Sequence, residues 1–517
     1  MSLARNTLVQ SSLTLGSRIL GFVRDMALAA RFGQEPMMDA FTTALMLPNM
    51  FRRLFAEGAF SAAFVPLFAR ELHGGGREAA LTFARQAQAV LLVVLLPLSV
   101  LAILAMPWVM KVLAPGLADE ATFNLAVDFG RITFPYLLFI SLMSLYAGVL
   151  NGIERFAHVA ATPILLNLTL IAAVLGLTPL LPNGGYAAAI GVTLSGIAQW
   201  LWLVWACRRE DVPVGVVRPR LTERVRRLVI LATPIAIGGG AQQINLVLDV
   251  VWASLMPAGA ISALYYADRL AQLPLGVAGV AIGTALLPLL ARNLSAGDET
   301  AAMDNQNRAV ELGLLFALPA AVALWLLAEP IVRLLFERGQ FTPADTLRTA
   351  SALAAFAIGI PAFVAIKALT PGFFAREDTK TPLYTAVASI VVNVVLNVVF
   401  LYATSLQHVG IALASSLAGW LNVALLAMIL ISRGHWRPDA RLLQRSFGIV
   451  LASAGMGVLL WLAMRRDASD LMVLAYCVGG GAIYAVLGML LRVIRLDELR
   501  AAFRRPPGVK REAGDVD

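Results

Sequence analysis

The sequence predicts an all-α polytopic membrane protein with fourteen transmembrane helices, arranged as two pseudo-symmetric six-helix lobes followed by two C-terminal helices. Three observations predict this fold: the composition, the apolar segments and an internal repeat. Of 517 residues, 59% are hydrophobic and only 14% are charged, and the mean hydropathy is +0.77. Soluble proteins usually carry about 25% charged residues. This chain therefore lacks the charge to cover a water-facing surface.

Fourteen apolar stretches are long enough to cross a bilayer, since about 20 helical residues span roughly 30 Å of hydrocarbon. Each is predicted to be an α-helix because lipid leaves no backbone polar group unpaired. The predicted spans are 6–30, 36–69, 86–110, 126–150, 159–180, 186–206, 229–255, 260–291, 309–332, 349–371, 383–403, 409–431, 446–464 and 471–491. The first is not predicted to be a signal peptide, because Arg18 and Arg24 interrupt it and no cleavage site follows.

Positive charge is concentrated in alternate loops. Of the 41 Lys and Arg residues, 27 lie in the termini and the loops after even-numbered spans, 7 lie in the other loops and 7 lie within spans. Because cytoplasmic loops carry the excess of Lys and Arg, both termini are predicted to be cytoplasmic. The net charge of +9 then reflects loops beside anionic lipid, so we expect membrane lipids and no nucleic acid as partners.

Proline and glycine landmarks recur at offsets of 219 to 226 residues. The pairs are Pro48 and Pro274, Pro66 and Pro288, Pro107 and Pro330, Gly116 and Gly339, Pro135 and Pro361, and Pro163 and Pro382. Six spans per repeat keep both halves in the same orientation, which implies a pseudo-two-fold axis along the membrane normal. The predicted parts are an N-lobe (1–210), a cytoplasmic linker (211–228), a C-lobe (229–435), helices 13 and 14 (436–495) and a cytoplasmic tail (496–517). Residues 221–228 are predicted to form a short interfacial helix.

The first two predicted spans are rich in charged residues. They contain Arg18, Arg24, Asp25, Asp39, Arg52, Arg53 and Glu57, while span 8 contains Asp268 and Arg269 and span 10 contains Lys367. A centrally placed Arg or Asp costs roughly 2.5–3.5 kcal/mol on insertion scales. These side chains must therefore be paired, or must face a protein interior or an aqueous cavity.

Helical spacing indicates how these charges are oriented. Residues seven apart share a face, so Arg18 and Asp25 form one stripe, and Ser17 and Arg24 form another. Arg24 and Asp25 are adjacent, and we expect that they do not face each other. At least one of the two must then find its partner elsewhere.

Two interpretations of the arginines remain open. In one, the charges pair across a seam between helices, as Arg53 and Glu57 can at a spacing of four residues. In the other, the arginines line a cationic cavity for an anionic substrate, because the planar guanidinium matches phosphate and carboxylate oxygens. The arginines concerned are Arg18, Arg24, Arg52 and Arg269.

The second half differs in its polar residues. Residues 238–240 are three glycines where the repeat would place 16–18, so the arginine cluster is confined to one half. Asp249 is a lone acid in span 7, and Asn393 and Asn397 lie one turn apart in span 11. These three residues are candidates for an oxygen-rich Na⁺ or proton site. The alternative is a buried Asp249 that is hydrogen-bonded to polar neighbours.

Motifs of several other functions are missing from the sequence. No G-x-x-x-x-G-K-[ST] phosphate loop and no H-E-x-x-H motif occurs, and no large extramembrane segment could house a catalytic site. We therefore predict neither an enzyme nor a protein with an organic cofactor. Residues 167–169 (NLT) match the glycosylation pattern but lie within a span, so the match carries no prediction.

Five motifs lie in order across spans 1 to 12. They are residues 17–25 (SRILGFVRD), 39–41 (DAF), 47–61 (LPNMFRRLFAEGAFS), 265–270 (YYADRL) and 367–382 (KALTPGFFAREDTKTP). Together they resemble the MurJ (MviN) lipid II flippases of bacteria. That family is part of the multidrug/oligosaccharidyl-lipid/polysaccharide exporter superfamily and typically has fourteen helices.

The resemblance implies movement of lipid II, the undecaprenyl-diphosphate-linked peptidoglycan precursor, from the cytoplasmic to the periplasmic leaflet of the bacterial inner membrane. It implies that the residues essential for handling this substrate are Arg18, Arg24, Asp39, Arg52 and Arg269. We add as supporting residues Ser17, Asp25, Arg53, Glu57, Asp268 and Lys367. The resemblance also implies a groove for the lipid tail at helices 13 and 14. Asn397 stands where some members have an acid, which weakens the proposed cation site.

From these observations we predict alternating access between the two halves. Coupling to Na⁺, to H⁺ or to the membrane potential is left open, and cell-wall synthesis or division proteins are candidate partners. One alternative is export of another polyprenyl-diphosphate oligosaccharide. A drug/cation antiporter would need isolated buried acids and few arginines, unlike spans 1 and 2. A glycosyltransferase or ligase would need a catalytic residue near a sizeable external loop, and a purely structural role leaves the buried arginines unexplained.

Overall fold

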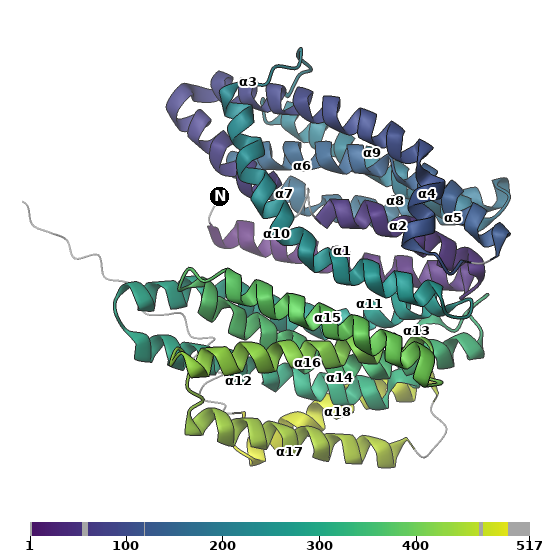
Figure 1. Ribbon diagram of the computed structural model, residues 1–517, viewed down its shortest axis with the longest axis vertical. Helices are drawn as coiled ribbons and strands as arrows, with labels where there is room; N and C mark the ends of the chain where they lie inside the picture. Colours follow the sequence, from purple (N-terminus) through teal and green to yellow (C-terminus); the bar gives the residue numbers. More distant parts are fainter. Residues whose placement is uncertain (1–2, 54–59, 118, 465–468, 495–517) are drawn as a thin grey trace, which may run out of the picture. The chain divides into compact units, whose positions relative to one another are not determined.

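The computed structural model describes residues 3–53, 60–117, 119–464 and 469–494, with the backbone alone described at 3–11, 235–242, 244–245, 277–281 and 283–285. These residues form α-helices joined by short connections, and no β-strand occurs among them (Figure 1). The helices are α1 (Leu3–Phe32), α2 (Pro36–Phe51), α3 (Phe60–Leu104), α4 (Met106–Leu113), α5 (Glu120–Thr133), α6 (Tyr136–Gly152), α7 (Phe156–Ala160), α8 (Thr162–Leu177), the 3-10 turn η2 (Thr178–Leu180), α9 (Gly184–Arg209), α10 (Glu223–Ser254), α11 (Ala260–Ser295), α12 (Glu299–Leu326), α13 (Ala328–Phe336), α14 (Pro343–Phe374), α15 (Lys380–Ala403), α16 (His408–Ser432), α17 (Ala440–Ala463) and α18 (Asp470–Leu490).

Ten helical segments of the described chain are long and apolar enough to cross a membrane. They correspond to predicted spans 3 to 6 and 9 to 14. The predicted spans 1, 2, 7 and 8 are also helical, as α1, α2, α10 and α11, but are not among the ten. The prediction of an all-α, multi-pass membrane protein is therefore confirmed, and the count of fourteen stays a prediction.

Two predicted spans depart locally from a regular α-helix. In the range 36–69, α2 ends at Phe51 and is followed by a π-helical turn at Arg52 and Arg53. In the range 126–150, α5 and α6 meet at Pro135, whose ring removes a backbone donor from the helix. The segment labelled α3 consists of two helices that meet at Gly76, whose φ of +75° is non-helical and is a conformation that glycine adopts readily.

A short non-helical segment connects α9 to α10. Helix α9 ends at Arg209 and α10 begins at Glu223, so the predicted short interfacial helix over 221–228 is wrong: most of its residues form the first turns of α10. An acid in the first turn favours helix initiation at this point, and the apolar residues that follow allow the helix to continue. The start of α10 is fixed to α3 by an ion pair between Arg224 and Glu71, with a nitrogen–oxygen distance of 2.9 Å.

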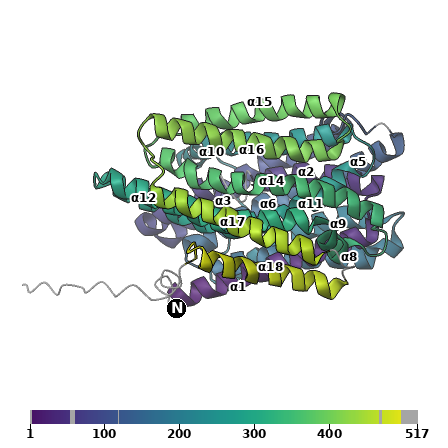
Figure 2. The same cartoon turned by 90° about the horizontal axis from the view of Figure 1, so that it is seen from below.

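Packing divides the chain into two compact units. The first comprises Met1–Ala267, Leu335–Ala352 and Asn397–Ile411, and the second comprises Asp268–Leu334, Leu353–Leu396 and Ala412–Asp517. These boundaries differ from those of the predicted lobes, linker and tail, which stay predictions. In the first unit α3, α6 and α9 run side by side (Figure 1). In the second unit α17 packs between α12 and α18 (Figure 2).

Small residues allow the helices of the first unit to pack closely. A Cβ added at Gly148 of α6 would lie 2.5 Å from the Phe64 ring of α3, and one at Gly152 would lie 2.5 Å from the Phe68 ring. Phe64 and Phe68 are themselves stacked, with ring centroids 5.7 Å apart. Helices in lipid gain little from the hydrophobic effect between them, so this close fit at a G-x-x-x-G spacing is what holds α3 against α6.

One landmark pair of the repeat makes equivalent contacts in the first unit. A Cβ at Gly116 would lie 2.2 Å from the carbonyl oxygen of Ser254, at the end of α10. A Cβ at Gly339 would lie 2.2 Å from the carbonyl oxygen of Ala30, near the end of α1. The two glycines are separated from each other by the repeat offset, and so are the two residues that they contact, Ala30 and Ser254. Reciprocal contacts of this kind are what a two-fold relation requires, and they support the predicted repeat.

A capped loop joins α14 to α15 in the second unit. Asp378 accepts hydrogen bonds from the Thr381 hydroxyl at 2.6 Å and backbone N–H at 2.9 Å, and it pairs with Arg433 at 2.6 Å. Chiefly because of the Thr381 hydroxyl, the pKa of this exposed carboxyl is lowered to about 2. Part of the 367–382 motif is thus explained by helix initiation and not by substrate binding.

A buried charge network fixes α17 to α12 in the second unit. Glu311 of α12 accepts from Arg308 and from Arg445 of α17, and Arg308 also pairs with Asp439 at the start of α17. The side chains of Glu311 and Arg445 are only 9% and 10% exposed. Because both side chains are buried, removing either one would leave the other as an uncompensated buried charge, which is strongly unfavourable.

We expect Glu311→Ala to destabilise the protein by about 3–5 kcal/mol, because it leaves Arg445 buried without its counter-charge. The matched control is Glu329→Ala, which removes an exposed partner of Arg333 and should change stability by less than about 1 kcal/mol. Thermal unfolding of the two purified variants in detergent measures the difference. Equal melting temperatures for both variants would show that the buried α12–α17 network contributes no more to stability than an exposed ion pair does.

Candidate substrate-binding site

Arg24 of α1 lies in a polar network inside the first unit. Its guanidinium donates to Asp25 Oδ1 from Nε at 3.0 Å and from Nη2 at 2.7 Å, and to Asn167 Oδ1 of α8 at 3.0 Å. Tyr265 of α11 donates its hydroxyl to the same oxygen of Asp25 at 3.2 Å. The side chains of Arg24 and Asp25 are 16% and 4% exposed. The network therefore neutralises Arg24 within a largely buried environment.

The expectation that Arg24 and Asp25 do not pair is wrong. Their Cα–Cβ bonds diverge on the helix, as the spacing argument states, but the long arginine stem lets the guanidinium curl back to the neighbouring carboxylate. In an apolar surrounding this local pair forms because it compensates both charges at once.

Asn167 is a site residue that the sequence reasoning missed. Besides accepting from Arg24, its amide donates to the backbone oxygen of Ser17 at 3.0 Å, so it links two turns of α1 to α8. It is 4% exposed. The available signal was an amide inside an otherwise apolar span, because buried polar groups are almost always hydrogen-bonded.

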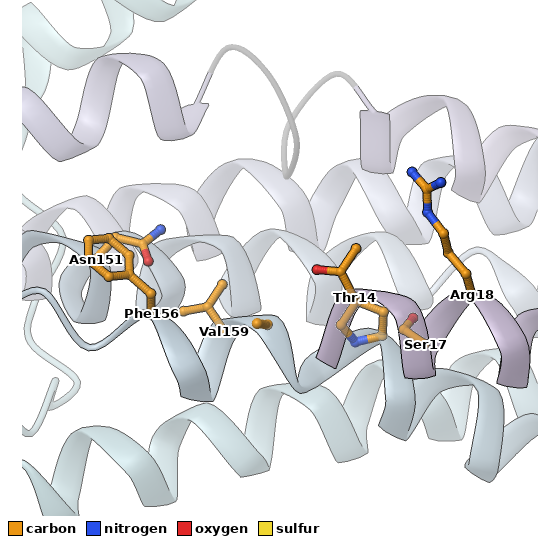
Figure 3. Close-up of a pocket in the computed structure, with 8 residues that line it drawn as sticks. Thr14, Ser17, Arg18, Asn151, Phe156 and Val159 are labelled. Carbon is orange, nitrogen blue, oxygen red and sulfur yellow. The ribbon is translucent and has the colours of Figure 1, made fainter. Parts of the chain in front are cut away.

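Arg18 contrasts with Arg24. Its side chain is exposed, and its guanidinium makes no ion pair or hydrogen bond to any other residue in the described part of the chain. It lines a cavity of about 440 Å³ between α1 and the α6–α7–α8 segment (Figure 3). The residues lining this cavity are Thr14, Ser17, Arg18, Asn151, Phe156, Val159, Ala160 and Pro163. A charged fork beside a partly apolar cavity can hold an anionic group of a larger ligand.

Asp39 is held by backbone donors. Its two carboxylate oxygens accept from the N–H of Gly259 at 2.6 Å and of Ser262 at 2.8 Å, at the N-terminus of α11. The side chain is 3% exposed. The negative charge is stabilised by the positive end of the helix dipole. In this structure Asp39 is therefore a capping residue that joins α2 to α11, and direct contact with a substrate stays a prediction.

Further contacts surround this cap. Gln34, between α1 and α2, donates to the backbone oxygen of Asp345 at 3.1 Å and to the hydroxyl of Thr349 in α14. The N–H of Gln340 donates to the oxygen of Ala30 at 2.9 Å. We call this set, together with the Asp39 cap, the seam. It joins the end of α1 and the start of α2 to segments that follow α10 and α13.

The other predicted residues of the first unit are partly or fully buried. Arg52 and Arg53 lie in the π-helical turn after α2, Asp249 lies in α10 and Asn397 lies in α15. Each of the four makes at least one polar or electrostatic contact. Glu57 lies outside the described residues, so its pairing with Arg53 stays a prediction.

Four predicted residues belong to the second unit. Asp268 accepts a hydrogen bond from Gln272, and Asn393 donates one to the Ser415 hydroxyl at 3.1 Å. Arg269 is half-buried and makes at least one polar or electrostatic contact. Lys367 is exposed and makes no ion pair or hydrogen bond to another described residue. The cation site of Asp249, Asn393 and Asn397 stays a prediction.

The sequence belongs to a described protein family. The family model "Lipid II flippase MurJ" matches residues 28–479. A probable lipid II flippase MurJ of Rhizobium meliloti (strain 1021) is 47% identical over 90% of this chain and 87% of its own length. The lipid II flippase MurJ of Burkholderia cenocepacia is 36% identical over 90% of this chain and 91% of its own length.

Solved structures agree with these relatives. A lipid II flippase MurJ in an inward closed conformation matches with a TM-score of 0.80 and 27% identity, covering 94% of this chain and 99% of that one. An inward-facing MATE family transporter matches with a TM-score of 0.70 at 14% identity, covering 82% of this chain and 97% of that one, which shows a shared fold alone. From its sequence and its structure alike, the chain belongs to the MurJ family.

Proposed function

We propose that this protein moves lipid II, an undecaprenyl-diphosphate-linked peptidoglycan precursor, from the cytoplasmic to the periplasmic leaflet. Family membership supports the substrate, because its named relatives are lipid II flippases. The observation that carries the proposal is Arg18: an exposed guanidinium beside a cavity, with no counter-charge among the described residues. A cation left in this state is suited to a substrate that brings its own negative charge.

Arg18 and Arg24 have different parts in this proposal. Arg18 offers its full donor fork to the diphosphate. Arg24 is already bonded to Asp25 and Asn167, so it would first hold the shape of the site and could reach a phosphate only by exchanging one of these partners. Arg52, Arg53 and Arg269 are further candidates for the anionic parts of the head group.

Alternating access requires the seam to open and close. Both oxygens of Asp39 are bonded to the start of α11, and Gln34 is bonded to Asp345 and Thr349. While these bonds hold, the segments that meet there cannot separate. We propose that the seam closes one side of the transport path, and that release of the head group on that side breaks the Asp39 cap.

The driving force is proposed to come from the membrane and not from ATP. An inside-negative potential favours outward movement of an anion by roughly 2.3 kcal/mol per charge per 100 mV. Coupling to Na⁺ or H⁺ through Asp249, Asn393 and Asn397 is the alternative. The process needs no covalent chemistry, so we propose a transporter that is not an enzyme.

The charge bias of the loops supports a location in the bacterial cytoplasmic membrane with both termini in the cytoplasm. In that proposed orientation the α6–α7 turn, with Asn151 and Phe156 of the cavity wall, would lie near the cytoplasmic side. The head group would therefore meet Arg18 early on its path. Proteins of cell-wall synthesis or division are the partners that such a location makes available.

We expect Arg18→Ala to slow lipid II transport about 10- to 100-fold, because hydrogen bonds to charged groups contribute about 1.5–3 kcal/mol. Transport is measured in proteoliposomes by the exposure of labelled lipid II in the outer leaflet. Arg31→Ala is the matched control: Arg31 is also exposed on α1 and is likewise without a partner among the described residues. Wild-type transport by Arg18→Ala would refute the role given to Arg18.

We expect Asp39→Asn to open the seam, because an amide keeps one acceptor oxygen and loses the charge that faces the α11 N-terminus. Ser262 is 0% exposed, so a Ser262→Cys reporter should react slowly with an impermeant maleimide in the parent protein. Labelling should increase severalfold when Asp39→Asn is added. The control is Asp304→Asn, an exposed acid of α12. Equal labelling with and without Asp39→Asn would contradict a closing role for the cap.

A further inference from the structure

The cavity beside Arg18 has two chemically different ends. Figure 3 shows Arg18 at one end of the lining, with its side chain extending away from Ser17, and Asn151 with Phe156 at the other end. Val159 and Pro163 contribute apolar surface to the same cavity. Its volume of about 440 Å³ is in the range of small-molecule sites, which are mostly apolar with a few placed polar groups.

Two polar groups in the wall, the Asn151 amide and the Ser17 hydroxyl, are available to a ligand. In the described part of the chain, neither the Asn151 amide nor the Ser17 hydroxyl makes a hydrogen bond to another side chain or to the backbone. The amide of Asn151 offers two donors and one acceptor. It can therefore pair with a second amide, whose N–H and C=O need one acceptor and one donor.

The local backbone is shaped to present this end of the cavity. Asn151 lies at the end of α6 and Phe156 begins α7, and the turn between them is closed by the N–H of Arg155 donating to Leu150 at 2.8 Å. Glu154 adopts a φ of +61°, a left-handed conformation that is uncommon for a residue other than glycine. The turn thereby places an amide and an aromatic ring in one wall.

An N-acetylated hexose matches this wall. Its ring carries C–H surface that can lie on Phe156, its acetamido group can pair with Asn151, and the acetyl methyl can contact Val159. Joined to a diphosphate, such a sugar has its anionic and amide groups at opposite ends, in the order in which the cavity places Arg18 and Asn151.

We propose that this cavity binds the N-acetylhexosamine attached directly to the diphosphate of the substrate, with Arg18 on the diphosphate and Asn151 and Phe156 on the sugar. The inference rests on the proposed function, since it takes a lipid-linked diphosphate sugar as the substrate. It assigns to Asn151 and Phe156 the preference for a sugar-bearing lipid, and to Arg18 the affinity for the diphosphate alone.

The test compares three lipids on the full-length protein in nanodiscs: phosphatidylglycerol, a polyprenyl diphosphate, and the same polyprenyl diphosphate carrying one N-acetylhexosamine. The parent protein should bind the sugar-bearing lipid about tenfold more tightly than the bare diphosphate, and phosphatidylglycerol most weakly. Asn151→Ala and Phe156→Leu should each remove most of this preference and leave binding of the bare diphosphate unchanged. Arg18→Ala should weaken binding of both diphosphate lipids.

Matched controls are Asn124→Ala, at an exposed asparagine of α5, and Phe447→Leu, at a phenylalanine of α17 that is 66% exposed. Both should keep the full preference for the sugar. A parent protein that binds the two diphosphate lipids equally, or an Asn151→Ala variant that keeps the preference, overturns the sugar subsite and leaves the proposed function standing. Failure of the parent protein to distinguish either diphosphate lipid from phosphatidylglycerol overturns the proposed function together with the subsite.

Discussion

The structure of the first unit depends on how it compensates arginine charge in an apolar environment. A buried charge is costly unless it is paired and its remaining donors are satisfied. Arg24 meets this condition through Asp25 and Asn167, and Asp25 is bonded in turn to Tyr265. Because these partners lie on three helices, one charge ties α1, α8 and α11 together. Arg18 has no such set among the described residues and lines a cavity, so a substrate can compensate its charge.

Sequence patterns predicted the parts of this protein that depend on local properties. Mean hydropathy and span length predicted the helices, because a bilayer imposes the same requirement on every crossing segment. The charge-bearing spans identified Arg18 and Arg24, but not the partners of Arg24. That a guanidinium curls onto the adjacent Asp25, and that Asn167 reaches it from α8, depends on side-chain paths and tertiary neighbours that no periodicity encodes.

The Asp39 cap has a position that the repeat helps to explain. Asp39 and Ser262 are separated by 223 residues, the offset of the Gly116 and Gly339 pair. Two residues related by a two-fold axis can touch each other only close to that axis. On the predicted two-fold repeat, the contact between Asp39 and Ser262 would therefore lie close to the axis.

Some backbone contacts follow the predicted repeat, whereas the charges do not. Gly116 and Gly339 make equivalent backbone contacts, but the repeat places glycines 238–240 opposite residues 16–18, so Arg18 has no cationic counterpart. Symmetric contacts allow two halves to exchange between two arrangements of similar energy, and a site on one half alone gives the ligand a fixed orientation. A substrate with one charged head and one lipid tail is itself asymmetric. In the proposed alternating-access cycle, a single cationic site would hold the head in both arrangements while the packing around it changes.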